Sequence, residues 1–179
     1  MEDLFFDKTV KRDNGPLGKV FPVVSIIAAA LFIVFLNAIP ILMGVNIIYF
    51  TGMVSLGIGY LVYRANISLK VEYQIEITND QFELTKITNN KKNELLADFS
   101  IKDAEYIGCV TSDRFNDDLA KSDFCLNATT LKKYCINENN WYVFITQDRT
   151  PFIIIFQFDE EMYPIFRRYN PRGTQRYDS

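Results

Sequence analysis

The absence of charge over a long stretch is the strongest pattern in this chain. Between Lys19 and Arg64 no Asp, Glu, Lys or Arg occurs, and Ile, Leu, Val, Phe and Ala predominate. A transmembrane helix needs about 20 apolar residues to cross a hydrocarbon core of about 30 Å, so this segment has room for two crossings. Residue types that disfavour an uninterrupted helix gather near its middle, namely Asn37, Pro40, Gly44 and Asn46. The pattern predicts a two-helix transmembrane hairpin over residues 20–63, with helices at about 20–39 and 45–63.

A soluble helix pair and a cleaved signal peptide both fit the apolar segment less well. A buried helix pair in a soluble protein would need a large core around it, and 179 residues offer too little chain to cover two charge-free helices. A cleaved signal peptide starts with a basic region, whereas this N-terminus carries Glu2, Asp3, Asp7 and Asp13, and the apolar run continues far beyond Ala30. We therefore interpret the segment as membrane-spanning.

Basic residues flank the predicted hairpin on both sides. Lys8, Lys11, Arg12 and Lys19 precede it, Arg64 and Lys70 follow it, and the connecting turn is uncharged. Because Lys and Arg are enriched on the cytoplasmic side, this arrangement predicts a multi-pass protein of the cell membrane with both termini in the cytoplasm. Three glycines of the second helix are interpreted as packing positions within the hairpin, with a dimer interface as the alternative: Gly52, Gly57 and Gly59.

From residue 69 onwards the hydrophobic period changes to two, which is typical of half-buried strands. Val71, Tyr73, Ile75 and Ile77 alternate with polar residues, and the turn at 78–81 leads to a second alternating strand. The predicted strands cover residues 71–77, 82–85, 95–99, 104–110, 131–136, 141–146 and 152–158, the last one buried on both faces. Residues 111–123 are predicted to form a long acidic loop with a helical turn near 117–121.

A helix and a polar tail complete the predicted order. Met162, Ile165, Phe166 and Tyr169 have the i, i+3, i+4, i+7 spacing of one helix face, with Asp159 as a candidate N-cap. The pattern predicts an α+β protein in four parts. These are an N-terminal cytoplasmic segment (1–19), the membrane hairpin (20–63), a cytoplasmic domain (69–169) and a mobile tail (170–179).

Three segments carry a resemblance to a known family, namely residues 71–79 (VEYQIEITN), 84–87 (LTKI) and 99–105 (FSIKDAE). The chain resembles an uncharacterised bacterial family of small membrane proteins, in which a membrane hairpin precedes a pleckstrin-homology-like (PH-like) domain. The resemblance covers nearly the whole chain. It implies an antiparallel β sheet or barrel capped by a C-terminal helix, and it implies no activity.

Composition restricts the possible chemistry. The chain has no histidine, so the commonest general base and zinc ligand is missing. Cys109, Cys125 and Cys135 lack C-x-x-C spacing, and the acidic loop from Asp113 lacks the glycine that a calcium-binding EF-hand loop requires at its sixth position. The net charge of −3 argues against nucleic-acid binding. We therefore expect no catalytic residue, metal site or cofactor, and no enzymatic activity.

A few residues are candidates for contacts with a partner. The turn at 78–81 lacks the basic residues that inositol-lipid binding by a PH domain would require. Two lysine pairs are either solvated or directed at lipid headgroups: Lys91 with Lys92, and Lys132 with Lys133. If Trp141, Val143 and Ile145 face the core, Tyr142 and Phe144 face outward and are available to a partner.

The main hypothesis from these observations is a non-enzymatic membrane protein that presents its cytoplasmic domain to a membrane-associated protein or peptide. The alternative is an accessory subunit or modulator of a transporter or channel that acts through its helices. Ionisable residues within the bilayer, which would favour that alternative, do not occur between residues 20 and 63. A membrane-bound enzyme ranks third, since it would need a pocket of convergent polar groups.

Overall fold

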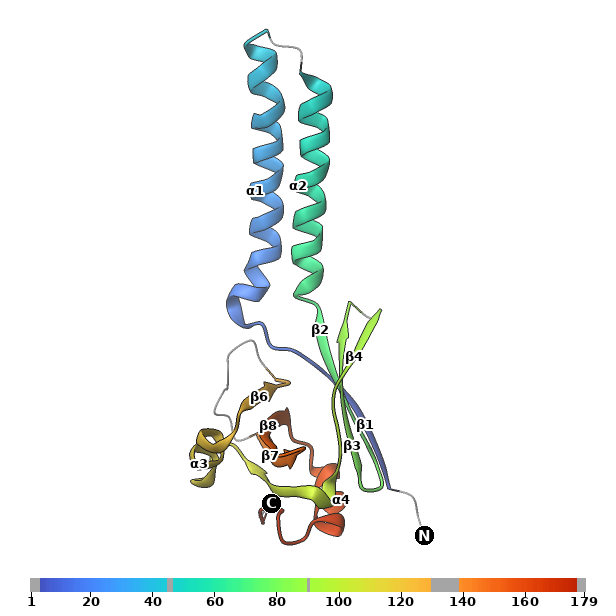
Figure 1. Cartoon of the computed structure of the whole chain (residues 1–179). Helices are drawn as coiled ribbons and strands as arrows, with labels where there is room; N and C mark the ends of the chain where they lie inside the picture. Colours follow the sequence, from blue (N-terminus) through green and yellow to red (C-terminus); the bar gives the residue numbers. More distant parts are fainter. Residues whose placement is uncertain (1–3, 45–46, 90, 130–138, 177–179) are drawn as a thin grey trace. The chain divides into compact units, whose positions relative to one another are not determined.

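Strand formation begins ahead of the apolar segment, in a region without a predicted element. In the computed structural model, which describes residues 4–44, 47–89, 91–129 and 139–176, strand β1 (Phe5–Lys11) pairs antiparallel with β2 (Val71–Thr78) (Figure 1). Seven residue pairs form this ladder. The N–H of Arg12 extends it by donating to the carbonyl of Val71 at 3.0 Å. Two strands that are about 60 residues apart in the sequence are thus neighbours in one sheet.

The chain therefore divides into two compact units with boundaries that differ from the predicted ones. One unit comprises residues 1–13 and 71–179, and the other comprises residues 14–70. The predicted N-terminal segment 1–19 is split between them, and the domain predicted to begin at residue 69 lacks its first strand. The helical unit is an insertion between two paired strands.

The first sheet confirms the period-two alternation. It has four antiparallel strands in the order β1-β2-β3-β4, with β3 at Gln81–Thr88 and β4 at Lys92–Ser100. Val71, Tyr73, Ile75 and Ile77 of β2 are buried. The β2–β3 turn places Asn79 at a φ of 57°, a left-handed conformation that asparagine tolerates better than most residues.

The second sheet departs from a simple meander. Its order is β5-β7-β8-β6, with β5 at Ala104–Cys109, β6 at Phe124–Asn127, β7 at Asn140–Gln147 and β8 at Thr150–Gln157. The short strand β6 runs parallel to β8. The described strands hydrogen-bond as two separate sheets, joined through a 3-10 turn η1 (Ile101–Asp103), so within the described residues no closed barrel forms. The strand predicted at 131–136 lies outside the described residues.

Apolar packing covers both faces of the second sheet. The main core joins inward residues of both sheets to the C-terminal helix, and a smaller core lies under α3 (Arg114–Lys121), with Phe115 at its centre. The residues of β8 from Phe152 to Phe156 are all buried, which confirms the prediction of a strand buried on both faces. The helical turn predicted near 117–121 lies within α3, but the helix begins earlier, at Arg114, inside the segment predicted as a loop.

The C-terminal helix is confirmed, but the mobile tail is not. A 3-10 turn η2 (Glu160–Met162), capped by the Asp159 carboxylate, leads into α4 (Tyr163–Tyr169). Pro164 thus lies in the first turn, where its missing N–H breaks no hydrogen bond. After α4 the chain follows the edge of β5: Ile107 donates to the carbonyl of Gly173 at 2.9 Å, and Thr174 is buried. Residues 170–176 are therefore part of the fold.

The helical unit contains two helices, α1 (Gly15–Leu42) and α2 (Ile48–Ser68). Helix α1 extends beyond its predicted bounds at both ends, whereas α2 begins later than predicted, at Ile48, and continues beyond its predicted end. Pro40 does not end α1; the helix continues to Leu42, and Gly44, at a φ of 69°, provides the left-handed residue that commonly follows a helix end. The Asn14 amide donates to the carbonyl of Leu69 at 2.7 Å, so the two ends of the unit meet.

The strand ladder across the insertion predicts that the helical unit can be removed cleanly. Replacing residues 14–70 with Asn-Gly should yield a soluble, monomeric domain that unfolds cooperatively, because Asp13 and the inserted pair then join β1 and β2 as a three-residue hairpin loop. Size-exclusion chromatography measures whether the domain is monomeric, and chemical denaturation measures whether it unfolds cooperatively.

A matched control is the fragment 71–179, which lacks β1. It leaves the β2 edge unpaired and uncovers the core beside Phe6, so we expect aggregation or a lower unfolding midpoint. Equal stability of the two proteins would contradict the role of β1.

Candidate functional site

Polar side chains of the helical unit lie on the seam between α1 and α2. On α1 the partly buried residues include Ser25, Ala29, Ile33 and Asn37, each four positions after the last. On α2 the seam carries Thr51, Ser55, Val62 and Asn66. Every described serine, threonine and asparagine between residues 20 and 63 is on this seam. The seam is thus the polar part of an otherwise apolar helix pair.

Each of these polar side chains takes part in a hydrogen bond within the helical unit. Asn37 donates across the seam to the Ser55 hydroxyl at 3.0 Å and within its own helix to the carbonyl of Ile33 at 2.8 Å. The hydroxyl of Ser25 lies 3.4 Å from the Asn66 side-chain oxygen. Ser55 also donates to the carbonyl of Thr51 at 2.7 Å. Such back-bonding and interhelical bonds are how polar residues are accommodated in a hydrocarbon environment.

The outward faces of the two helices are apolar and exposed. They present Val24, Ile27, Leu31, Val34 and Phe35 from α1 and Phe50, Met53, Leu56 and Leu61 from α2. By length and apolarity, one helix of the described chain qualifies as a candidate membrane span, α1 over Gly18–Leu42, and none of it is buried. The end of α2 is more polar, because it continues through Arg64 and Asn66.

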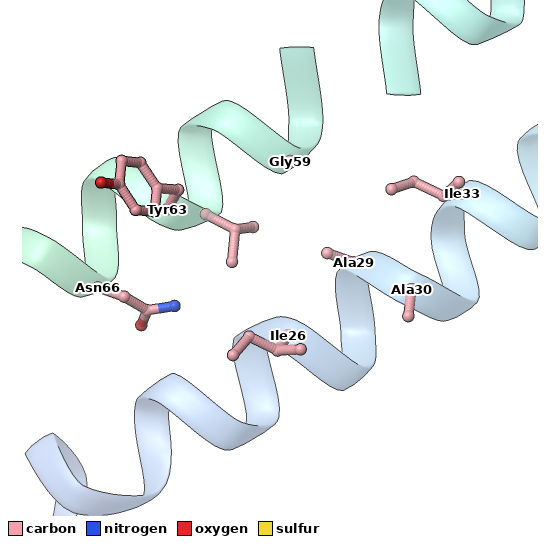
Figure 2. Close-up of a pocket in the computed structure, with 8 residues that line it drawn as sticks. Ile26, Ala29, Ala30, Ile33, Gly59, Tyr63 and Asn66 are labelled. Atoms are coloured by element: carbon pink, nitrogen blue, oxygen red, sulfur yellow. The ribbon is translucent and has the colours of Figure 1, made fainter. Parts of the chain in front are cut away.

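An open groove of about 340 Å³ lies between α1 and α2 (Figure 2). The groove is open because small residues line it, namely Ala29 and Ala30 of α1 and Gly59 of α2. Tyr63 and Asn66 line one end. A side-chain carbon added at Gly52, Gly57 or Gly59 would meet no atom within 4 Å. The interpretation of these glycines as packing positions within the hairpin is therefore wrong.

Tyr142 and Phe144 are not on the surface. Their exposed fractions are 0% and 4%, because α3 covers the face of the second sheet to which they point. The predicted partner contact at these two residues is therefore corrected. The uninterrupted apolar run 141–145 was the signal that could have shown this, since strands buried on both faces lack alternation.

A buried carboxylate holds α3 in place above this face. Asp118 is fully buried, accepts from the Arg114 guanidinium at 2.9 Å and lies 3.0 Å from the Tyr142 hydroxyl. Arg114 also stacks over the ring of Tyr106. Burial, with the neighbouring Asp118 charge, raises the pKa of Tyr142. The cluster keeps the hydroxyl protonated as a donor to Asp118, which is a structural role.

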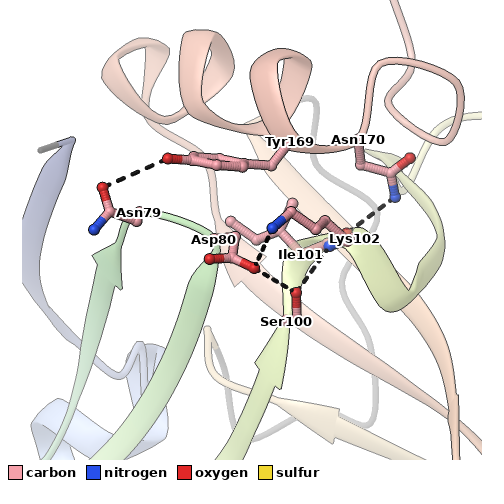
Figure 3. A network of polar contacts seen from close by, with 7 residues as sticks. All are labelled: Asn79, Asp80, Ser100, Ile101, Lys102, Tyr169 and Asn170. Atoms are coloured by element: carbon pink, nitrogen blue, oxygen red, sulfur yellow. Dashed lines mark hydrogen bonds and ion pairs between the residues drawn. The ribbon is translucent and has the colours of Figure 1, made fainter. Parts of the chain in front are cut away.

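The carboxylate of the β2–β3 turn takes part in a network of polar contacts (Figure 3). Lys102 forms an ion pair with Asp80 at 2.8 Å, and Ser100 donates to the same carboxylate at 2.9 Å. These two donors lower the pKa of Asp80. Tyr169 and Asn170 of the C-terminal region contact the same turns through Asn79 and the carbonyl of Ile101. The network joins the first sheet to the C-terminal region, and its only lysine is neutralised.

The two lysine pairs have different positions. Lys91 and Lys92 are exposed at the β3–β4 turn. Register places this turn at the end of the first sheet where the chain leaves for the helical unit and returns from it: Val71 pairs with Thr88, and Thr88 with Lys92. Lys132 and Lys133 lie outside the described residues.

No metal centre is found in the part of the chain that the structure describes: no three His, Cys, Asp or Glu side chains come together there. In the acidic segment 111–123, the carboxylate of Asp118 is already bound by the Arg114 guanidinium and the Tyr142 hydroxyl. Cys109 and Cys125 are partly buried in β5 and β6, and Cys135 lies outside the described residues.

Comparison with known proteins gives a family for nearly the whole chain. The family model described as bacterial PH-like domain (DUF6106), a domain of unknown function, matches residues 2–176. No curated protein and no solved structure matches the chain. The match includes β1, the helical insertion and the segment that follows α4, so all three are parts of the family's domain and none is an appended segment.

The buried Asp118 cluster predicts a strong local effect on stability. Asp118→Ala leaves the Tyr142 hydroxyl buried without its acceptor and removes the partner of Arg114, so we expect a loss of about 2–4 kcal/mol in the free energy of unfolding. Asp117→Ala, at the neighbouring exposed position, is the matched control and should change stability by less than about 0.5 kcal/mol. Denaturant unfolding of the two variants measures the difference, and similar effects would contradict the assigned role of Asp118.

Proposed function

This chain belongs to the bacterial PH-like domain family, and we propose that it is a non-enzymatic integral membrane protein. In this proposal the two helices anchor it in the cell membrane, and the PH-like domain is presented at the cytoplasmic face to a membrane-associated protein or peptide. The observation that carries the proposal is the inverted polarity of the helical unit, with polar groups on the seam and apolar groups outside.

The inverted polarity is costly in water. A soluble helix pair buries its apolar residues on the seam and exposes polar ones, and soluble monomers seldom expose contiguous apolar patches above a few hundred Å². Here the exposed faces consist of large apolar side chains such as Phe35, Phe50 and Leu56. Lipid is the solvent in which such a surface is stable, and the satisfied seam is what a bilayer requires of polar groups.

The strand ladder supports an even number of crossings. Because Lys11 pairs with Glu72, the chain leaves the PH-like domain and returns to it at the same end of one sheet. If α1 crosses the bilayer, α2 must cross back. The 25 residues of Gly18–Leu42 correspond to about 37 Å of helix and the 21 residues of α2 to about 31 Å, each sufficient for a core of about 30 Å.

Recognition of a protein or peptide fits the domain better than recognition of an inositol lipid. Beside the β2–β3 turn, Lys102 of η1 is already paired with Asp80, so a phosphorylated headgroup would have to compete with an existing ion pair. A tethered domain also needs little intrinsic affinity for a membrane-associated partner, since confinement raises the effective concentration of each for the other.

Membrane extraction and labelling test the anchoring. The full chain should remain with the membrane fraction in alkaline carbonate and dissolve only in detergent. In a background with the three cysteines replaced by alanine, Gly44→Cys should react in intact cells with a membrane-impermeant maleimide. Asn93→Cys in β4 should react only after permeabilisation, and it serves as the matched cytoplasmic position. Full-length protein that stays folded and monomeric in the aqueous fraction without detergent would contradict the proposal.

A second candidate function, an accessory subunit of a transporter or channel, is favoured by one observation. The groove between the helices and the unfilled space at Gly52, Gly57 and Gly59 would allow another transmembrane helix to approach closely. The helical unit alone, residues 14–70, should then retain a multi-span protein at constant stoichiometry in mild detergent, and Gly59→Leu should release it. Retention that requires the PH-like domain instead would rule out this candidate.

A further inference from the structure

The charges of the first sheet are distributed unequally between its two ends. At the end next to the helical insertion, residues 10–13, 71–72, 86–89 and 91–94 hold five basic and three acidic side chains. At the other end, residues 4–7, 77–83 and 98–103 hold one basic and five acidic side chains. Although the chain as a whole is acidic, one end of this sheet therefore has a local excess of positive charge.

Two lysines at the β3–β4 turn contribute to this excess without a described ion pair. Lys11 lies 3.9 Å from Glu72, and Lys86 lies 3.4 Å from Glu94, so each of these basic groups has an acidic neighbour. Lys91 and Lys92 are exposed at the β3–β4 turn, and no ion pair is found for either within the described residues. Their charges are available to a ligand outside the chain.

Chain connectivity limits how far these lysines can be from the end of α2. Lys92 is two strands from Val71, about 10 Å across the sheet, because both residues pair with Thr88. Val71 follows Ser68, the last residue of α2, by three positions, which span at most about 11 Å. The backbone of Lys92 therefore lies within about 20 Å of the end of α2, whatever the orientation of the two units.

From these limits we propose that Lys91 and Lys92 contact anionic phospholipid in the leaflet from which the helices emerge. This contact orients the PH-like domain on the membrane and is separate from its anchoring. The inference rests on the membrane anchoring proposed above. The ligand is the negative surface of the leaflet and not a single headgroup in a pocket, since exposed lysines act on a surface as point charges.

The contact needs only modest strength. One lysine beside an anionic surface shifts an equilibrium about fivefold, so two shift it about 30-fold. Because the anchor already holds the turn near the headgroups, this bias is sufficient to favour one orientation of the domain. Salt should weaken the contact, since the Debye length falls from about 10 Å at 0.1 M to about 3 Å at 1 M.

The experiment uses the full chain in nanodiscs, with its three cysteines replaced by alanine and one fluorophore at Asn93→Cys. Quenching by a headgroup-level quencher is measured in discs of phosphatidylcholine alone and in discs with about 30% phosphatidylglycerol. We expect quenching to rise at least about threefold with the anionic lipid and to return to its lower value in about 1 M NaCl. A fluorophore at Asp98→Cys, near the other end of β4, should show no such rise.

Charge variants identify the lysines as the cause. Lys91→Gln with Lys92→Gln should abolish the rise in quenching. Lys121→Gln with Arg172→Gln, which removes the same charge from exposed positions elsewhere, should leave it unchanged. All variants are compared by denaturant unfolding, and a salt-sensitive rise in the unsubstituted protein decides the question even if one variant unfolds.

The outcomes separate this inference from the anchoring. A chain that fails to enter nanodiscs, or that carbonate strips from membranes, overturns the proposed anchoring and this inference with it. A chain that is anchored but shows equal quenching in both lipid mixtures overturns only the lysine contact. The lysine contact is equally overturned if the double lysine variant shows the same rise in quenching with anionic lipid as the unsubstituted protein. It is also overturned if the two substitutions leave that rise unchanged and weaken only the binding of an acidic protein.

Discussion

The pairing of β1 with β2 is the constraint on which the rest of the structure depends. It closes the first sheet across a 57-residue insertion, residues 14–70, and fixes both ends of that insertion side by side. Closing so long a loop with a flexible chain costs conformational entropy that grows with the logarithm of its length. If α1 and α2 associate first, the hydrogen bond between Asn14 and Leu69 already brings the ends together. Assembly of the helices would then lower the cost of completing the sheet.

Sequence periodicity correctly predicted the helices and strands whose faces each contact a single environment, either the core or solvent. The alternation of β2, the fully buried β8 and the amphipathic C-terminal helix all follow from contact with a single core. Strand β1 could not be predicted in the same way, because its partner is about 60 residues away and only Phe6 of its side chains is buried. Helix α3 was obscured by Asp118, a charged residue on its buried face whose cost is met by Arg114 and Tyr142.

The candidate site shows the same division. The uncharged segment and the exposure of Lys91 and Lys92 could be inferred from composition. Lysine side chains stay in water and long apolar runs avoid it, so neither inference needs knowledge of the fold. The burial of Tyr142 and Phe144 could not be inferred from alternation alone, because α3 covers the face that a two-layer arrangement would leave open. The polar seam of the helices was also missed. A pattern of Ser25, Asn37 and Ser55 acquires meaning only when their hydrogen-bond partners are known.

Attachment through two neighbouring strands has a consequence that a single tether does not have. One flexible linker leaves a domain free to rotate about the membrane normal and to tilt, so a partner must immobilise it on binding. In the proposed anchoring the domain has two attachment points, at Lys11 and Val71, which lie on adjacent paired strands. Two such attachment points would leave a tethered domain fewer orientations than one flexible linker does, so less rotational entropy would remain to be lost on binding. Weak contacts, such as those of two lysines with a charged leaflet, can then select an orientation that they could not impose on a freely tethered domain.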